Sequence, residues 1–140
     1  MTAQEVIDLL GLERHPEGGW FGETFRDPEP ANGRAHSTAI YYLLAEGEIS
    51  AWHRVDAVEV WHYYGGAPLA ISLAGESGPA ERHVLGMDLG GGQRPQVIVP
   101  RHYWQSAQSL GAWTLVGCTV APGFEFAGFE MAPEGWAPRS

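Results

Sequence analysis

The sequence contains no lysine, and its eight basic residues are all arginines. A Schiff base to a carbonyl substrate or to pyridoxal phosphate needs a lysine amine, so that chemistry is excluded. The formal net charge is −9. Because proteins that bind nucleic acid or anionic membranes need a basic face, neither is an expected partner. A small-molecule ligand, even an anionic one, is still compatible if a few arginines face a cleft.

Cysteine is almost absent. The single one, Cys118, lies in the apolar run TLVGCTVA, so it has no partner for an intramolecular disulfide, and we expect a core thiol. The sequence also lacks a recognisable signal peptide and any apolar run of membrane-spanning length. These absences predict a cytoplasmic protein.

Glycine (19 residues), proline (10 residues) and aromatic residues (11%) are abundant, whereas charged residues make up 18%. This composition is typical of many short strands joined by tight turns. A capping box of Thr2 and Glu5, with Gly11 as a stop, predicts one helix over residues 2–10. Strands are predicted at 20–26, 36–46, 49–53, 58–64, 68–74, 80–87, 96–100, 102–108 and 113–121, and a short strand or helical turn at 124–132. We expect a single all-β domain over residues 1–140, a closed sandwich or barrel.

The stretch from Gly47 to Gly66 places a histidine and a carboxylate on two neighbouring predicted strands, His53 and Glu59. Two strands that each contribute an inward polar group can form a ligand cup. Strand alternation puts Trp61 and Tyr63 on the face of Glu59, where they are predicted to form an aromatic wall unless they are plain core. Alternation turns His62 to the opposite face.

Two other segments contribute candidates. In the predicted strand 20–26, Trp20, Thr24 and Arg26 share one face, and Thr24 and Arg26 could supply contacts to an anion, although an arginine at a strand end also suits a solvated edge. Tyr103 is in step with Gln105 two residues later. It is a candidate proton donor or hydrogen-bond anchor.

The central spacing resembles the first cupin motif: a glycine, five residues, His53, one residue, Val55, three residues, Glu59, six residues and a glycine. Val55 stands where that motif has its second histidine. The segment PRHYWQ resembles the second motif, with a histidine in the glycine place and Gln105 in the histidine place. The blocks LGLERHPEGGWFGETFR, HRVDAVEVWHYYGGAPL, VIVPRHYWQSA and LVGCTVAPGFEFAGFE together resemble a small one-domain cupin family of unknown function, the fifth cupin group.

This resemblance implies a double-stranded β-helix, or jelly-roll barrel, with a pocket between its sheets, and a homodimer. A typical cupin metal site uses three histidines and a glutamate, and a metal is one possibility for this pocket. Here His53, Glu59 and Gln105 would hold a divalent ion such as manganese, iron, nickel or zinc weakly, because Val55 cannot ligate. The metal-free alternative is a His53–Glu59 dyad that moves protons on a carbon acid next to a carbonyl.

Three hypotheses for function follow. The first is an isomerase or epimerase acting on a small polar or sugar-like metabolite. His53 would be its general base or metal ligand, Glu59 would orient His53 or share the metal, and Gln105 would complete the site. The second is a non-catalytic protein that binds a sugar or a nucleotide sugar in the same pocket. The third is a structural relict, in which His53 and Glu59 only satisfy each other.

Overall fold

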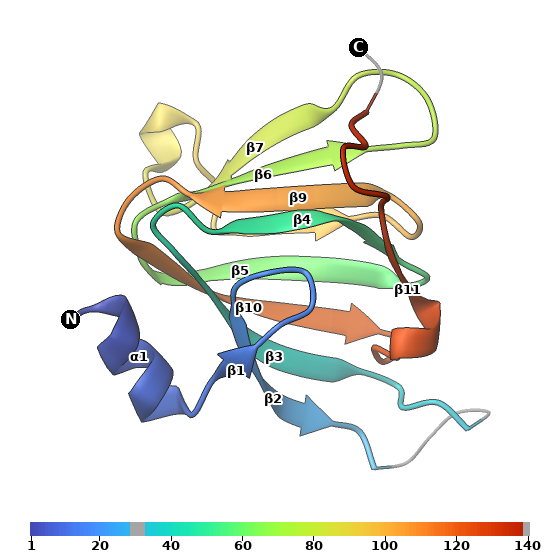
Figure 1. The fold of residues 1–140 in the computed structure, drawn as a ribbon, viewed down its shortest axis with the longest axis horizontal. Coiled ribbons are helices and arrows are strands. Elements are labelled where there is room, and N and C mark those ends of the chain that lie inside the picture. The colour runs from blue at the N-terminus through green and yellow to red at the C-terminus, as the bar shows by residue number, and fades with distance from the viewer. Residues whose placement is uncertain (29–32, 139–140) are drawn as a thin grey trace.

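The computed structural model describes residues 1–28 and 33–138, which form two antiparallel sheets preceded by one helix (Figure 1). One sheet has the strand order β1-β2-β3-β10-β5-β8 and the other the order β11-β4-β9-β6-β7. The elements are α1 (Ala3–Leu10), β1 (Glu13–Arg14), β2 (Trp20–Arg26), β3 (Thr38–Ala45), β4 (Ile49–Val55), β5 (Val58–Gly66), β6 (Leu69–Ala74), β7 (Glu81–Leu85), the 3₁₀ turn η1 (Leu89–Gly91), β8 (Gln96–Val99), β9 (Trp104–Ser109), β10 (Trp113–Ala121), the 3₁₀ turn η2 (Phe126–Gly128) and β11 (Phe129–Met131). The all-β prediction is confirmed. Residues 124–132 form both a helical turn and a strand.

The N-terminal helix forms as its capping residues predict. The Glu5 backbone N–H donates to Thr2 Oγ1 at 3.1 Å, and the Thr2 N–H donates to Glu5 Oε1 at 3.1 Å. Gly11 ends the helix in the left-handed conformation. Val6 and Ile7 of α1 pack with Leu43 of β3, so the helix covers one part of the outer face of the first sheet.

Apolar side chains from both sheets fill much of the interior. Their contact explains why the strands alternate between buried and exposed positions. The most deeply buried members are Tyr42, Leu44, Trp61, Leu69, Ile71, Leu85 and Val116. Toward β11 and η2, beyond this core, the interior contains a cavity instead of packed side chains.

A tight turn of residues 15–19, between β1 and β2, closes against β3 and β4. Gly18 and Gly19 have positive φ values of 104° and 77°. A Cβ added to Gly18 would collide with the Ile49 carbonyl oxygen, and one added to Gly19 would lie 2.8 Å from the Leu43 carbonyl oxygen. The Ala51 N–H donates to the Glu17 carbonyl oxygen at 2.7 Å. This close approach carries the Glu17 side chain into the interior.

The variant Gly18→Ala should therefore destabilise the protein far more than Gly47→Ala does. Both glycines have positive φ, but nothing lies within 4 Å of a Cβ at Gly47. We expect a cost of about 1 kcal/mol for Gly47→Ala from backbone strain alone. For Gly18→Ala we expect roughly 3 kcal/mol or more, because the backbone of β4 must move. Urea denaturation measures both, and equal costs would contradict the close packing of the turn.

Strand β2 contains an irregularity that the sequence pattern does not show. Its register against β3 shifts between Glu23, which pairs with Ile40, and Phe25, which pairs with Ala39. Thr24 is the extra residue, a β-bulge that reverses the alternation after it. The expected shared face of Thr24 and Arg26 is therefore wrong.

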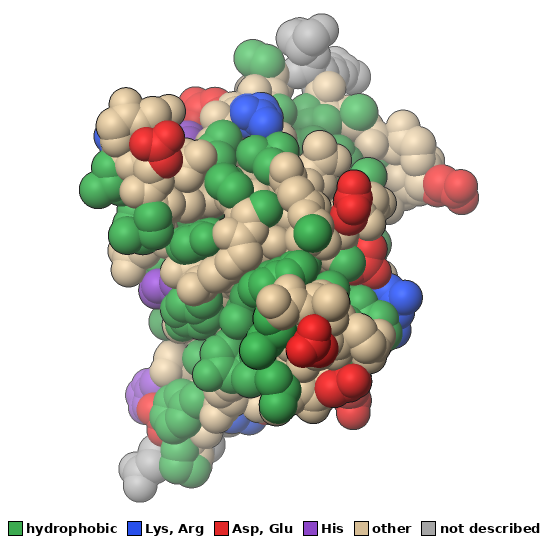
Figure 2. Space-filling model, turned by 90° about the vertical axis from the view of Figure 1, so that its left-hand side faces the viewer, with side chains coloured by type: hydrophobic (Ala, Val, Ile, Leu, Met, Phe, Trp, Pro, Cys, Tyr) green, Lys and Arg blue, Asp and Glu red, His purple; other side chains and the backbone are tan. Residues whose placement is uncertain are grey.

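The face of the molecule nearest α1 carries broad hydrophobic areas with scattered acidic side chains between them (Figure 2). Such areas are common on interacting surfaces. The homodimer implied by the resemblance stays a prediction, and multi-angle light scattering measures it directly.

None of the helices in the described residues is long and apolar enough to cross a membrane.

Candidate active site

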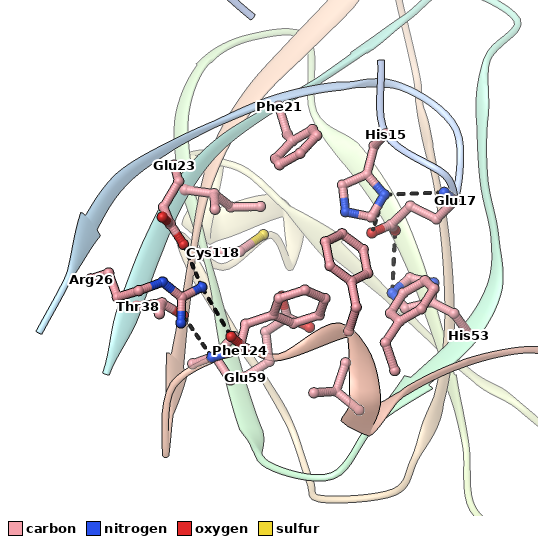
Figure 3. Close-up of a pocket in the computed structure, with 15 residues that line it drawn as sticks. His15, Glu17, Phe21, Glu23, Arg26, Thr38, His53, Glu59, Cys118 and Phe124 are labelled. Atoms are coloured by element: carbon pink, nitrogen blue, oxygen red, sulfur yellow. Dashed lines mark hydrogen bonds and ion pairs between the residues drawn. The ribbon is translucent and has the colours of Figure 1, made fainter. Parts of the chain in front are cut away.

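The cavity lies between the two sheets and has a volume of about 260 Å³. Its polar groups gather at two places separated by phenyl rings (Figure 3). One group contains His15, Glu17 and His53, and the other contains Glu23, Arg26 and Thr38. The remaining lining residues are Phe21, Ile40, Val55, Glu59, Cys118, Val120, Phe124, Phe126 and Phe129.

His53 of β4 faces Glu17 rather than the predicted Glu59. Its Nδ1 lies 2.7 Å from the Ala51 carbonyl oxygen, which can only accept, so Nδ1 carries the hydrogen. In the neutral ring Nε2 is then an acceptor, and it lies 3.2 Å from Glu17 Oε2. Burial lowers the pKa of His53, which favours this neutral ring. Glu17 Oε2 also accepts a short hydrogen bond from the Ser50 hydroxyl.

His15 presents a second acceptor to the same carboxyl. The Glu17 backbone N–H donates to His15 Nδ1 at 3.1 Å, and that nitrogen lies 3.2 Å from Glu17 Oε1. A Glu17 carboxylate would face two nitrogen lone pairs, whereas a protonated carboxyl can donate to one of them. Desolvation by burial raises the pKa of Glu17 to about 8, against which the Ser50 hydrogen bond acts. Glu17 is thus an acid that keeps its proton at neutral pH.

The Glu59 side chain of β5 is hydrogen-bonded to the Gln105 side chain of β9. The Trp61 indole N–H can only donate, and it lies 2.9 Å from Gln105 Oε1. The Gln105 amide NH₂ therefore faces the other way and donates to Glu59 Oε1 at 2.9 Å. Desolvation by burial, with a smaller contribution from nearby Glu17, raises the pKa of Glu59 to about 7, against the opposing effects of His53, Gln105 and Cys118. Glu59 is therefore a base that is partly ionised at neutral pH.

The bulge in β2 turns Arg26 toward the cavity opposite Thr38, with which it pairs in the β2–β3 register. Arg26 Nη2 donates to Glu23 Oε1 at 2.6 Å and to the Phe124 carbonyl oxygen at 3.0 Å. The Glu23 carboxylate thus compensates the positive charge of Arg26. Thr24 does not line the cavity, and its hydroxyl donates to the Ala39 carbonyl oxygen at 3.1 Å.

The aromatic candidates lie elsewhere. Trp61 faces inward but is 1% exposed within the packed core, and it does not line the cavity. Tyr63 packs against the same core, and its hydroxyl donates to the Gly66 carbonyl oxygen at 2.5 Å. Tyr103 is 40% exposed, ahead of β9, and is also not a lining residue. Their predicted placement at the cup is therefore corrected. His62 faces away, as alternation predicts, and its Nε2 lies 2.9 Å from Thr119 Oγ1.

The aromatic wall comes instead from a segment of residues 123–131, which we name the lid segment. Its Phe124, Phe126 and Phe129 contact one another edge to face at centroid distances of 5.0–5.9 Å. Arg34 anchors the segment: its Nε donates to the Gly123 carbonyl oxygen at 2.6 Å, and its two Nη atoms bind the Asp56 carboxylate at 2.9 and 3.0 Å. Such a bidentate pair fixes geometry well.

Comparison with known proteins agrees with this architecture. Residues 4–132 match the family described as Cupin superfamily (DUF985). The chain belongs to this cupin family. Protein SO0799 from Shewanella oneidensis is 36% identical, with a TM-score of 0.91 over 94% of this chain and 85% of that one. A hypothetical protein from Leishmania major is 27% identical, with a TM-score of 0.89 over 94% and 88% of the two chains.

Two further matches identify no activity for this chain. The uncharacterised yeast protein YML079W from Saccharomyces cerevisiae is 28% identical over 89% of this chain and 72% of its own length. Oxalate decarboxylase from Bacillus subtilis is 15% identical, with a TM-score of 0.66 over 84% of this chain and 29% of that one. That distant likeness concerns the cupin fold alone.

The metal set expected from the cupin resemblance, His53, Glu59 and Gln105, does not fit a cation here. The Gln105 oxygen already accepts from Trp61, and the group it turns toward Glu59 is an NH₂ donor. His53 Nε2 faces Glu17, and Val55 offers no donor atom. Among residues 1–28 and 33–138, no group of three or more histidine, cysteine, aspartate or glutamate side chains is placed to hold a metal ion.

Adding manganese, iron(II), nickel or zinc ions should accordingly leave the thermal midpoint of unfolding unchanged. A specific ion at 100 times its Kd would stabilise the folded state by about 2.7 kcal/mol, which is readily detected. Differential scanning fluorimetry makes the measurement, with the variant His53→Ala as the control. A stabilisation seen in the wild type and lost in that variant would contradict our assignment of the donors.

Sequence reasoning missed His15 and Glu17, which lie in the turn of residues 15–19. It also missed the phenylalanines of the lid segment. The one available signal was the pair of glycines after Glu17, since consecutive glycines often mark a close approach of two backbones. Hydrophobic periodicity carries no information about where such a turn packs.

Proposed function

We propose that this cupin is an isomerase or epimerase that moves a proton on a small metabolite containing a carbonyl group. One observation carries the proposal: two buried carboxyls, Glu17 and Glu59, face one cavity together with His53, and burial raises the pKa of both. A carboxyl that faces acceptor nitrogens keeps its proton and can act as an acid, whereas one that accepts a hydrogen bond favours the carboxylate and can act as a base. Perturbed carboxyls inside a cleft also favour a functional site over a relict.

The proton balance of such a step is simple. The Glu59 carboxylate takes a proton from the carbon next to the substrate carbonyl, and the electron pair of that C–H bond becomes the enolate. The protonated Glu17 then delivers a proton to the enolate at carbon or oxygen. Afterwards Glu59 holds a proton and Glu17 has lost one. Proton exchange with solvent, or through His53 Nε2 at 3.2 Å from Glu17, resets the pair.

Hydrogen–deuterium exchange tests this proposal without knowledge of the natural substrate. The protein is incubated in D₂O at pD 7.5 with carbonyl probes such as phenylacetone, phenylpyruvate and cyclohexanone. We expect the α-hydrogen ¹H signal of at least one probe to decay roughly 100-fold faster than in buffer. The variant Glu81→Gln, which changes an exposed carboxyl on β7, is the matched control and should exchange like wild type. No acceleration with any probe would contradict an enzyme of this type.

A second candidate, a binding protein without activity, is favoured by the hydrocarbon of the cavity wall. Phe21, Phe124, Phe126 and Phe129 supply much of this wall, and phenyl rings hold a ligand without reacting with it. Saturable binding of a probe that shows no exchange would support this candidate.

A further inference from the structure

The proton transfer proposed above assigns no role to His15, which also lines the cavity. Its ring is boxed by aromatic neighbours, with centroid distances of 4.6 Å to Phe21, 5.8 Å to Tyr42 and 6.0 Å to Phe129. Desolvation by burial in this box lowers the pKa of His15 to about 4, with a smaller contribution from the nearby His53 imidazole. The ring is therefore neutral throughout the physiological range.

The hydrogen of this neutral ring is located by its partner. Nδ1 accepts the Glu17 backbone N–H at 3.1 Å, so the hydrogen sits on Nε2. The residue is 8% exposed, and Nε2 has no hydrogen-bond partner among residues 1–28 and 33–138. The same ring nitrogen is turned toward the open part of the cavity (Figure 3). Because no fully buried side-chain nitrogen or oxygen of the described residues lacks a partner, Nε2 is accessible from the cavity, where a ligand oxygen can replace water as its acceptor.

The rest of the cavity indicates what kind of molecule carries that acceptor. Its walls are largely hydrocarbon, and its one arginine, Arg26, is already paired with Glu23. The ionised fraction of Glu59 would repel an anion. A cavity of about 150 Å³ holds benzene, so about 260 Å³ suits a ligand of roughly ten non-hydrogen atoms. A nucleotide sugar is too large and too polar for this space.

We propose that His15 Nε2–H donates a hydrogen bond to the carbonyl oxygen of the substrate, and that the substrate is an uncharged carbonyl compound with an aromatic or alicyclic body. A neutral imidazole in this position stabilises the developing enolate oxygen without giving up its proton. His15 is thus a catalytic residue. The hydrogen bond and the substrate class share only the cavity with the proposed function, whereas the catalytic role of His15 rests on that function.

The test compares matched probes by calorimetry and ¹³C NMR. Phenylacetone is an uncharged ketone, phenylpyruvate adds a carboxylate to the same skeleton, and 1-phenyl-2-propanol lacks the carbonyl. We expect phenylacetone to bind at least about 10-fold more tightly than either of the others. The ¹³C signal of its labelled carbonyl should move downfield on binding, as a hydrogen-bonded carbonyl does.

Two variants isolate the residue. His15→Phe keeps a ring but removes the donor, so the downfield shift should vanish. His15→Gln places an amide N–H near the Nε2 position, so the shift should be partly restored. If His15→Phe does not fold, the glutamine variant and the probe comparison still decide. Equal or tighter binding of phenylpyruvate, no binding of phenylacetone at millimolar concentration, or an unchanged shift in His15→Phe would each overturn the proposal.

Different experimental results would contradict the role of His15 and the proposed isomerase activity. Tight binding of phenylacetone with a His15-dependent shift but no α-hydrogen exchange supports the inference and contradicts the isomerase. Exchange of phenylpyruvate alone has the opposite meaning: the proton transfer stands, and the uncharged substrate class is wrong.

Discussion

Replacing Glu59 by glutamine should lower the rate of α-hydrogen exchange by roughly 10²- to 10⁴-fold, the usual contribution of a general base. The amide is nearly isosteric with the carboxyl, but it cannot take a proton from carbon. Gln105 presents an NH₂ group to Glu59 Oε1, and the amide oxygen of the substituted side chain accepts that hydrogen bond equally well. The fold should therefore be retained, and the loss should appear in the rate rather than in probe binding.

The pH dependence of exchange sharpens this prediction. The rate should rise as Glu59 ionises near pH 7 and fall as Glu17 loses its proton near pH 8, which gives a narrow bell. The rate remaining in Glu59→Gln should not rise near pH 7. A variant that exchanges at the wild-type rate, or with the wild-type profile, would remove Glu59 from the mechanism.

Replacing Glu17 by glutamine should abolish much of the loss of stability that the wild type shows at alkaline pH. The folded-state pKa of Glu17 is raised from 4.5 to about 8, so its contribution to stability is complete below the unfolded-state value and is lost as the pH rises through the folded-state value. Glu59 acts in the same direction up to about pH 7. His15 and His53 act in the opposite direction. Their pKa values are lowered in the folded state, so the protein loses stability as the pH falls and these rings are protonated.

Between pH 5.5 and 8.5 we expect the free energy of unfolding of the wild type to fall by roughly 3 kcal/mol, and that of Glu17→Gln to change by less than about 1 kcal/mol. The glutamine NH₂ can donate to His53 Nε2 as the protonated acid does, so the two proteins should be similar at pH 5.5. Urea denaturation across this range measures the difference, and Glu81→Gln serves as the exposed control. Parallel pH profiles for wild type and Glu17→Gln would show that Glu17 is not buried as an acid.

The sequence was sufficient for the fold because its local signals agree with one another. The capping box at Thr2, the β-rich segments and the cupin spacing around His53 each point to the same architecture, and the strands appear close to their predicted bounds. Inward placement of His53 and Glu59 also follows from alternation, which tertiary packing preserves in β4 and β5.

The pairing of side chains in the site could not be predicted in the same way. Whether His53 meets Glu17 or Glu59 depends on where a five-residue turn packs, and that is decided by close backbone contacts at Gly18 and Gly19. The bulge at Thr24 reverses the alternation of β2, which would otherwise turn Arg26 away from the cavity. Gln105 matches a ligand position in spacing, yet the Trp61 indole determines which end of its amide faces Glu59.

Carboxyl ¹³C NMR of protein labelled at the glutamate side chains tests the central claim most directly. The signals of Glu17 and Glu59 are assigned from the glutamine variants and followed from pH 3 to pH 10. We predict midpoints near 8 and near 7, both well above the ordinary glutamate value of 4.5. Midpoints of both groups near 4.5 would mean that water reaches both carboxyls freely, and the acid–base pair that we assign to this cavity would not exist.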